Sequence, residues 1–221
     1  MASLTVENYV KEIYHLCVAH SKAAATGQLA AALNVSPGTV TSMLKTLSES
    51  GLATYTPYEG VQLTAQGTAL ALRILRRHRL IELFLVDTLG LSWDEVHEEA
   101  EHMEHAVSDR LIDRIDAFLG HPTADPHGDP IPAADGSLRA PRTHSLAQCQ
   151  PGDRFELARV LDQSPEFLRY LTESNLSLGV RGHVVVNRPE AGIVTVCVDH
   201  ADVTLGREAA EKILVLEVDA Q

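Results

Sequence analysis

A set of histidine and glutamate side chains in the middle of the chain has the spacing of metal ligands. The set comprises His78, Glu82, His97, Glu101, Glu104 and His105. The last four are offset by four, seven and eight residues, so on a single helix they project from one face; the first two share a helix face in the same way. If the two helices are antiparallel neighbours, six nitrogen and oxygen donors can converge between them. Such a set suits Mn(II), Fe(II), Co(II), Ni(II) or Zn(II), whereas oxygen ligands alone would favour Ca(II) or Mg(II).

The alternative for this set is an acidic, histidine-rich face that is only solvated. Glu98, Glu99 and His102 fit that alternative, because the helical period turns them away from the neighbouring donors. The six donors differ, because the opposite side of the same segment is apolar and its burial would fix the orientation of the polar face. The apolar positions are Val96, Ala100, Met103 and Val107.

A second group of residues has the pattern of a recognition helix. Two helical patterns, at 26–33 and 37–49, are separated by a turn, and Ser36 followed by Pro37 is a favourable helix start. In a helix-turn-helix the second helix enters the major groove of DNA. The candidate DNA contacts are Ser36, Pro37, Gly38, Thr39, Thr41, Ser42 and Lys45. None of them offers the bidentate purine contact of Arg, Asn or Gln, so we expect no strong base readout. A winged helix used only for packing or dimerisation is the alternative.

The elements that must position these residues are mainly helical. Apolar residues recur at helical spacing over 4–20, and two short strand-like runs flank a turn at 57–60. With the two helices above, they predict a winged helix-turn-helix domain over residues 1–73. One helix is then expected from Ala65 to Leu89 and a second, unbroken one from Trp93 to Leu119. These two helices predict a helical dimerisation and metal-binding domain over 74–120.

The last part of the chain has a different sequence pattern, without long helical periodicity. Residues 121–149 lack periodicity and are rich in Pro, Gly and Asp, which predicts a linker, although Pro-Ile-Pro could pack as an ordered strap. Residues 150–221 contain short β-rich runs and one helical pattern from Ser164 to Thr172, which predicts a small barrel. The expected fold class is mainly α with a small all-β C-terminal domain.

Composition and charge limit the function. No apolar run approaches the ~20 residues of a membrane span, and the first residues lack the regions of a signal peptide, so we expect a cytoplasmic protein without a membrane partner. The three cysteines, an odd number at wide spacing, predict reduced and mostly buried thiols. The net charge of −12 argues at first against nucleic acid, but residues 1–80 carry seven basic and four acidic residues, a charge of +3, and the remainder carries −15. DNA contact and cation binding are therefore expected in different parts of the chain.

Taken in order, these features resemble the diphtheria toxin repressor family of metal-dependent regulators, including its manganese transport regulator branch. The resemblance spans nearly the whole chain and is carried by VENYVKEIYHL, NVSPGTVTSMLKTL, LTAQG, RRHRLIELFL, EVHEEAEHMEHAVSD and PHGDPIP. It implies a homodimer that binds palindromic operator DNA and represses metal-uptake genes. It also implies two metal sites in each subunit and a C-terminal SH3-like barrel.

The resemblance also implies roles for individual residues. The principal metal site falls on Glu101, Glu104, His105 and, at the N-terminal ligand position, Asn8; the ancillary site falls on His78, Glu82 and His97, with Gln163 and Glu166 matching loosely as ligands from the barrel. Iron-responsive members have a cysteine where this chain has Glu101, and a hard carboxylate favours Mn(II). Mn(II) or Fe(II) is the expected cofactor, and Zn, Co, Cd and Ni are expected to bind in vitro. Asn8 departs from the family pattern, since Met or Asp is typical there.

Two other functions remain open from the sequence. A metal enzyme, such as a hydrolase, could use the same Glu/His cluster, but it would need an open coordination position and a general base in a substrate-sized pocket. A metal-independent regulator could instead bind a small ligand in the barrel. We expect a regulator and not an enzyme.

Overall fold

The computed structural model describes residues 3–218, which form two compact units. The first unit comprises the chain up to residue 78 together with 104–107 and 132–137, and the second comprises 79–103, 108–131 and the chain from 138 onward. The unit boundary falls within one long helix, α4 (Ala65–Leu89). Each unit has its own buried side chains and is described separately.

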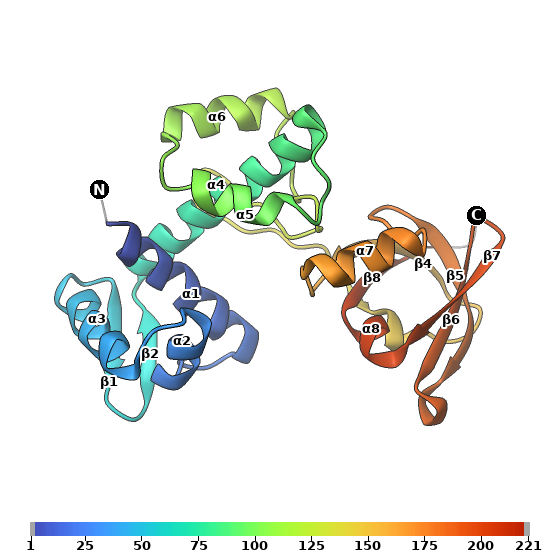
Figure 1. Ribbon diagram of the computed structural model, residues 1–221, viewed down its shortest axis with the longest axis horizontal. Helices are drawn as coiled ribbons and strands as arrows, with labels where there is room; N and C mark the ends of the chain where they lie inside the picture. Colours follow the sequence, from blue (N-terminus) through green and yellow to red (C-terminus); the bar gives the residue numbers. More distant parts are fainter. Residues whose placement is uncertain (1–2, 219–221) are drawn as a thin grey trace. The chain divides into compact units, whose positions relative to one another are not determined.

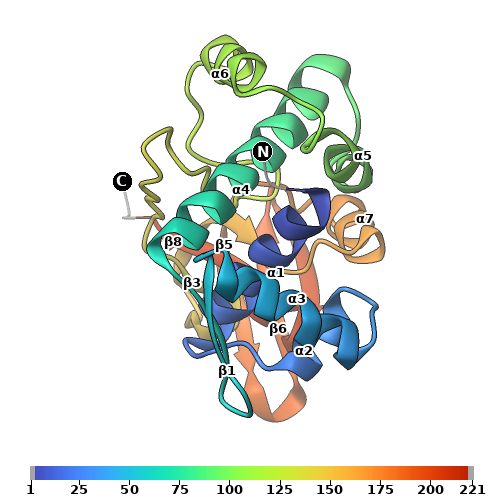
Figure 2. The same ribbon diagram turned by 90° about the vertical axis from the view of Figure 1, so that its left-hand side faces the viewer.

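The first unit is a winged helix (Figures 1 and 2). Its elements are α1 (Leu4–His20), α2 (Thr26–Ala32), α3 (Pro37–Glu49), β1 (Ala53–Thr56), β2 (Gly60–Leu63) and the first part of α4. The Ser36 hydroxyl caps α3 by accepting a hydrogen bond from the Thr39 amide at 3.2 Å, as its position before Pro37 predicts. The fully buried residues of the core are Val10, Ile13, Leu29, Val40, Leu44, Leu47, Val61 and Ala71.

The hairpin β1–β2 is the wing, and it is fixed to the connection between α1 and α2. The amide of Ala24 donates to the Val61 oxygen at 2.9 Å, and the Val61 amide donates back to Ala24 at 3.0 Å. Gly60 has φ +109°, and a Cβ there would lie 2.7 Å from the Ala24 oxygen. The turn at the start of β2 therefore requires glycine.

The second unit contains two short helices where the sequence predicts one long helix. These are α5 (Val96–Met103) and α6 (Asp109–Phe118). The prediction of an unbroken helix from Trp93 to Leu119 is therefore wrong. Ser108 caps a new helix, its hydroxyl accepting from the Leu111 amide at 3.3 Å. Glu104 and His105 consequently lie in a turn after α5, and not on one helix face with His97 and Glu101.

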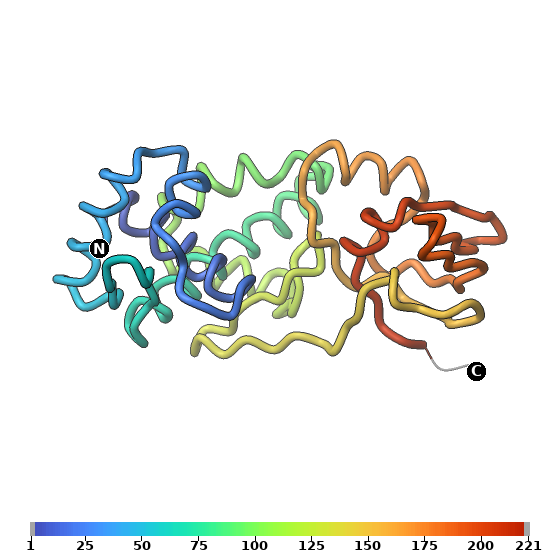
Figure 3. The backbone as a smooth tube through the Cα atoms, turned by 90° about the horizontal axis from the view of Figure 1, so that it is seen from below, coloured from blue at the N-terminus to red at the C-terminus, as the bar shows by residue number. Residues whose placement is uncertain are grey.

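Residues 121–131 form an ordered strap without helix within the second unit (Figure 3). Asp125, His127 and Ile131 are buried. The Val160 amide donates to the His127 oxygen at 2.9 Å, and a Cβ on Gly128 would collide with backbone atoms of Ala158 and Arg159. The strap therefore lies against the barrel strand β4 (Arg154–Val160) without space for a side chain at residue 128.

The remainder of the second unit is the small β-domain that the sequence predicts. Its antiparallel sheet has the order β3-β8-β4-β5-β6-β7 and begins at His144. The strands are β3 (His144–Ser145), β4 (Arg154–Val160), β5 (Arg181–Arg188), β6 (Ile193–Val198), β7 (Ala201–Gly206) and β8 (Ile213–Glu217). Two helices, α7 (Pro165–Glu173) and α8 (Arg207–Glu211), and the 3-10 turns η1 (Leu146–Gln148) and η2 (Pro189–Ala191) accompany them. Phe155, Leu157 and Leu168 belong to its core. The predicted fold class is confirmed.

None of the helices in the described residues is long and apolar enough to cross a membrane.

Candidate metal centre and nucleic-acid interface

In the first unit, Glu104 is a fully buried carboxylate between two cationic or hydrogen-bonding partners. Its Oε1 lies 2.8 Å from the Lys11 Nζ on α1, and its Oε2 lies 2.7 Å from the His78 Nδ1 on α4. Burial alone would raise the pKa of Glu104, but the hydrogen bond from His78 and the charge of Lys11 outweigh burial and lower it. Glu104 is therefore ionised and able to bind a cation.

His105 is oriented as a metal-ligating histidine would be. Its Nδ1 lies 2.7 Å from the Glu7 carboxylate on α1. Because a carboxylate accepts hydrogen bonds, this contact places the hydrogen of the neutral imidazole on Nδ1. The buried Nε2 has no hydrogen-bond partner among the described residues, yet it lies 3.1 Å from Glu104 Oε1. In this tautomer a nitrogen lone pair faces a carboxylate oxygen without a hydrogen between them, an arrangement that a metal cation would stabilise.

Asn8 adds a second unsatisfied acceptor in the first unit. Its Oδ1 is buried and accepts no hydrogen bond in the described part of the chain. Asn8 follows Glu7 on α1, the helix that also carries Lys11. A neutral amide oxygen is a suitable ligand for a hard divalent ion. The buried polar atoms of this unit therefore fit the metal that the sequence predicts.

The second unit brings together three further predicted ligands. Glu82 on α4 is almost fully buried, and its Oε1 lies 3.3 Å from the His97 Nδ1 on α5. The other ring nitrogen of His97 lies 3.9 Å from the Glu101 carboxylate, one turn later on α5. Glu98, Glu99 and His102 on the same helix are exposed, as the solvated interpretation predicts.

The strap contributes two donors that the sequence reasoning missed. Glu82, Asp125 and His127 each offer one ligand atom, and these atoms lie within 4.8 Å of one another. All three residues are buried. The Nδ1 of His127 has no hydrogen-bond partner among the described residues and lies 3.9 Å from Glu82 Oε2. The only sequence signal was the PHGDPIP stretch, which carried the family resemblance but lacked the periodicity that singled out the helical ligands.

The electrostatics around Asp125 would also suit a bound cation. Burial, together with the negative charges of Asp129 and Glu82, raises the pKa of Asp125 to about 8. Arg79 compensates in part, its Nε lying 3.6 Å from Asp125 and its Nη2 3.2 Å from Asp129. A divalent ion between Glu82, Asp125 and His127 would supply the remaining positive charge.

The two barrel residues predicted as ligands have other partners in the structure. Gln163 donates from Nε2 to Asp129 Oδ2 at 3.2 Å. Glu166 is 82% exposed and lies 3.5 Å from Arg169 on α7. A role for either in metal binding stays a prediction.

The predicted DNA contacts form an exposed surface at the start of α3. Six of the seven are exposed, and Thr41, which is half-buried, donates to the Pro37 oxygen at 2.9 Å. A groove of about 560 Å³ lies between α3, the start of α2 and the wing, with Lys45 on one side and Tyr58 on the other. Tyr58 is fully exposed at the tip of the wing and was not predicted from the sequence.

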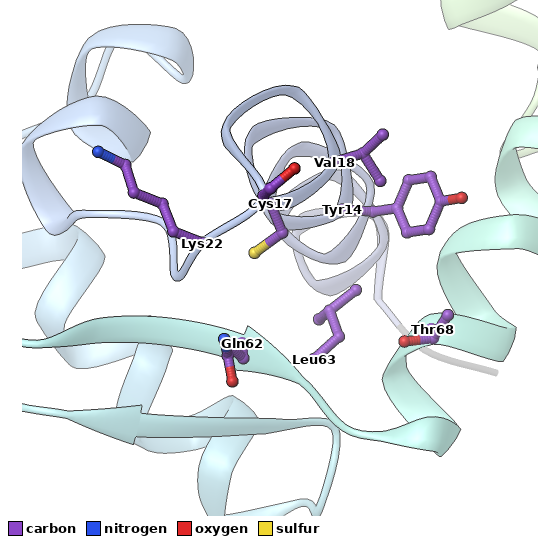
Figure 4. Close-up of a pocket in the computed structure, with 8 residues that line it drawn as sticks. Tyr14, Cys17, Val18, Lys22, Gln62, Leu63 and Thr68 are labelled. Carbon is purple, nitrogen blue, oxygen red and sulfur yellow. The ribbon is translucent and has the colours of Figure 1, made fainter.

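A smaller pocket of about 300 Å³ lies between α1, β2 and the start of α4 (Figure 4). Cys17 lines it, and its Sγ donates to the Val61 oxygen at 3.6 Å. The three cysteines are free thiols, but only Cys149 is buried, so the expectation of mostly buried thiols is wrong. No cluster of possible metal ligands found in the described residues includes a residue of this pocket.

Comparison with known proteins assigns consecutive parts of the chain to three family models. Residues 1–61 match the N-terminal DNA binding domain of iron dependent repressors, residues 64–133 match their metal binding and dimerisation domain, and residues 144–217 match the FeoA domain. The iron-dependent repressor IdeR of Mycobacterium tuberculosis is 32% identical over 233 residues, with 97% of each chain covered. The diphtheria toxin repressor of Corynebacterium efficiens is 29% identical over 225 residues, with 97% of this chain and 96% of that protein covered.

Solved structures agree with this assignment. A manganese-dependent transcriptional repressor in complex with manganese is 43% identical, with a TM-score of 0.85 over 96% of this chain and 100% of that chain. ScaR with bound Zn²⁺ is 33% identical, with a TM-score of 0.79 over 96% of this chain and 99% of that chain. These relatives are DNA-binding repressors and not enzymes, which confirms the predicted regulator and decides against a metal hydrolase. The chain therefore belongs to the iron-dependent repressor family of metal-dependent transcriptional repressors.

Proposed function

We propose that this chain is a Mn(II)- or Fe(II)-activated repressor of metal-uptake genes that binds palindromic operator DNA as a homodimer. The observation that supports it best is a pair of unsatisfied buried acceptors in the first unit. The Nε2 of His105 and the Oδ1 of Asn8 accept no hydrogen bond among the described residues, although both are buried. Unpaired buried polar atoms are costly, so a bound cation would stabilise this arrangement.

The principal site is assigned to Glu101, Glu104 and His105, with Asn8 as the ligand from α1. Glu101 precedes Glu104 and His105 by three and four residues, close enough in the chain for one ion to bind all three. Because Asn8 belongs to α1, a metal bound to it and to Glu104 would hold α1 in place. The α1 helix packs in the core that supports the recognition helix α3, so metal binding would favour one arrangement of the DNA-binding surface.

The second site is assigned around Glu82. His97 lies beside one oxygen of Glu82 and His127 beside the other, and Asp125 offers a ligand atom within 4.8 Å of those of Glu82 and His127. His78 precedes Glu82 by one turn of α4 and is its partner in the ancillary site expected from the sequence. We therefore assign Asp125 and His127 to metal binding in addition to His78, Glu82 and His97.

The ligand types favour Mn(II) over softer ions. None of the assigned ligands is a thiolate, and carboxylate and amide oxygens are hard donors that suit Mn(II). One structural relative was solved with manganese and others with Zn²⁺ and Cd²⁺, whereas IdeR is described as iron-dependent. We infer that Mn(II) or Fe(II) activates this chain and that Zn(II), Co(II), Cd(II) and Ni(II) bind in vitro.

The DNA surface is assigned to the start of α3, and the dimer surface to apolar side chains near α4 and α6. Leu89, Leu111 and Phe118 are more than half exposed, and the ring of Phe118 makes an edge contact with Phe84 at 6.2 Å. Exposed apolar clusters of this kind mark association surfaces. The matched family model describes this part of the chain as a dimerisation domain. Action on DNA implies a cytoplasmic location.

A mobility-shift titration tests the proposal. Mn(II) is expected to raise operator affinity relative to chelator-treated protein, which requires a coupling of ~1–3 kcal/mol between the metal and DNA sites. Glu104→Gln should lose this response, because an amide supplies no charge to the metal. Glu98→Ala, on an exposed position of α5, is the control and should keep it. Equal operator affinity with chelator and with excess Mn(II) would contradict the proposal.

A further inference from the structure

The ion pair between Lys11 and Glu104 places a protein cation where the proposed metal would bind. The two charged atoms are 2.8 Å apart, and the side chains are 12% and 0% exposed. Lys11 holds Oε1, the same carboxylate oxygen that lies 3.1 Å from the Nε2 of His105. A metal bound to both His105 Nε2 and Glu104 Oε1 would have to share that oxygen with the ammonium group or displace it.

The charge of Lys11 has opposite effects on the metal-free and the metal-bound site. An ammonium group and a divalent ion next to the same buried oxygen repel each other, and the repulsion is strong where little water is present. Without a metal, by contrast, Lys11 stabilises the buried charge of Glu104, because a buried carboxylate without a counter-charge is costly. The same side chain therefore favours the metal-free state and disfavours the loaded one.

We propose that Lys11 is an internal counter-cation of the principal site, so that metal binding exchanges the lysine ammonium for the metal at Glu104. This inference rests on the proposed function. It makes Lys11 a residue that sets metal affinity without being a ligand. It also explains how α1 stays attached to Glu104 before a metal arrives, since Lys11 and Glu7 both reach the Glu104–His105 turn from α1. The exchange would delay activation until the metal concentration is high enough to displace the lysine.

A plain structural ion pair is the competing interpretation, and it predicts the opposite change in metal affinity. If Lys11 only holds α1 in place, its removal should loosen the site and weaken metal binding. If Lys11 competes with the metal, its removal should strengthen metal binding although the metal-free protein becomes less stable. Affinity and stability therefore move in opposite directions only under the exchange.

The experiment is calorimetric titration of the full-length protein with Mn(II), in a His127→Gln background that removes a donor of the second site. Lys11→Met is expected to bind Mn(II) about tenfold more tightly, because a +1 charge beside the metal is gone. Lys11→Arg keeps the charge and should bind as the unsubstituted background does. Lys22→Met, at an exposed lysine just after α1, is the matched control and should change nothing.

Thermal unfolding of the same proteins supplies a readout that does not depend on DNA binding. Lys11→Met should melt at a lower temperature than the background without metal and show a larger rise on saturation with Mn(II). If Lys11→Met does not fold without metal, Lys11→Gln replaces it with the same expectation. Equal or weaker Mn(II) binding by the folded neutral variant would overturn the role of Lys11 and leave the proposed function intact. Absence of Mn(II) binding by the unsubstituted protein would overturn both.

Discussion

The imidazole of His127 donates a hydrogen bond from Nε2 to the main-chain oxygen of Trp93 at 2.7 Å. Because a carbonyl oxygen only accepts, the hydrogen is on Nε2, and the lone pair of Nδ1 is left on the side of Glu82. The two rings also stack, with centroids 6.1 Å apart and planes inclined by 15°. Trp93 in turn donates from Nε1 to the Thr172 hydroxyl on α7 at 3.0 Å. Trp93 therefore connects the His127 ring to α7.

Trp93 should report directly on metal binding to the strap. It is the only tryptophan of the chain, and its ring stacks on a proposed ligand of paramagnetic Mn(II). We expect its fluorescence to be quenched as Mn(II) is added, and His127→Gln to remove the effect. His102→Gln, an exposed histidine on α5, serves as the control. Quenching that persists unchanged in His127→Gln would argue against a metal at this position.

The raised pKa of Asp125 makes the metal-free protein sensitive to alkaline pH. Its value of about 8 lies above the ordinary 3.8, so the folded state binds this proton more tightly than the unfolded state does. The resulting stabilisation is fully present below 3.8 and is lost as the pH rises through 8. Asp125→Asn keeps an oxygen for the amides of His127 and Asp129, at 2.8 and 2.9 Å, and removes the charge.

Denaturant unfolding without metal measures this effect. The free energy of unfolding of Asp125→Asn, relative to that of the wild type, should increase steadily between about pH 5 and about pH 9. Asp94→Asn, on a residue outside the metal cluster that pairs with Arg169 at 3.2 Å, is the comparison. Parallel pH profiles for Asp125→Asn and the wild type would contradict the assignment of a raised pKa.

Lys45 should contribute to DNA affinity through phosphate contact and not through base recognition. It is exposed on α3 and lines the groove beside the wing. Lys45→Ala should weaken binding to operator and unrelated DNA alike and reduce the slope of log affinity against log salt by about one. Lys212→Ala, in the barrel, should leave the slope unchanged. A selective loss of operator binding alone would indicate base readout instead.

Glu101 should control the choice of metal. Replacing its carboxylate with the thiolate of Glu101→Cys favours Fe(II), Co(II) and Zn(II) relative to Mn(II), because softer ions gain more from sulfur. Operator affinity measured across the four ions, anaerobically for iron, is expected to show Mn(II) moving down the order of activation. If the order were the same in both proteins, Glu101 would not discriminate between metals.

The buried thiol of Cys149 should resist alkylation. Burial, with the negative charges of Asp153 and Glu217, raises the pKa of Cys149 to about 11. Thiolate is the reactive form, so almost none is present at about pH 8. Mass spectrometry after iodoacetamide treatment of the native protein is expected to find Cys149 unmodified, and modified after unfolding. Labelling of Cys149 in the folded state at the rate of a free thiol would disprove this.

Where the sequence carries a strong period or a cap, the fold was predictable. The bounds of α1, α3 and α4 agree with the sequence, because Ser36 with Pro37, and Gly90, mark helix ends by local chemistry. The break at 104–107 was missed because the apolar spacing continues through it, while the cap at Ser108 is a weaker signal. Periodicity shows which side of a segment is buried and does not show whether the helix continues.

The proposed metal cluster was predictable only in its helical part. Glu82 and His97 were identified by spacing, and the structure brings them together. Asp125 and His127 lie in a segment without helix or strand, where spacing along the chain does not show which way a side chain points. Their role depends on contacts with residues distant in sequence, above all the hydrogen bond from His127 to Trp93. The pairing of Lys11 with Glu104 could not be predicted from the sequence either, because the two residues are 93 positions apart.

The close approach of Gly128 to Ala158 and Arg159 also limits how this protein can evolve. Every other amino acid carries a Cβ, so no single substitution at residue 128 leaves the strap and β4 where they are. The backbone there is also in the left-handed region, with φ +84°. A descendant that abandoned this glycine would have to change the barrel strand at the same time, so the strap and the barrel can diverge only as one inherited unit.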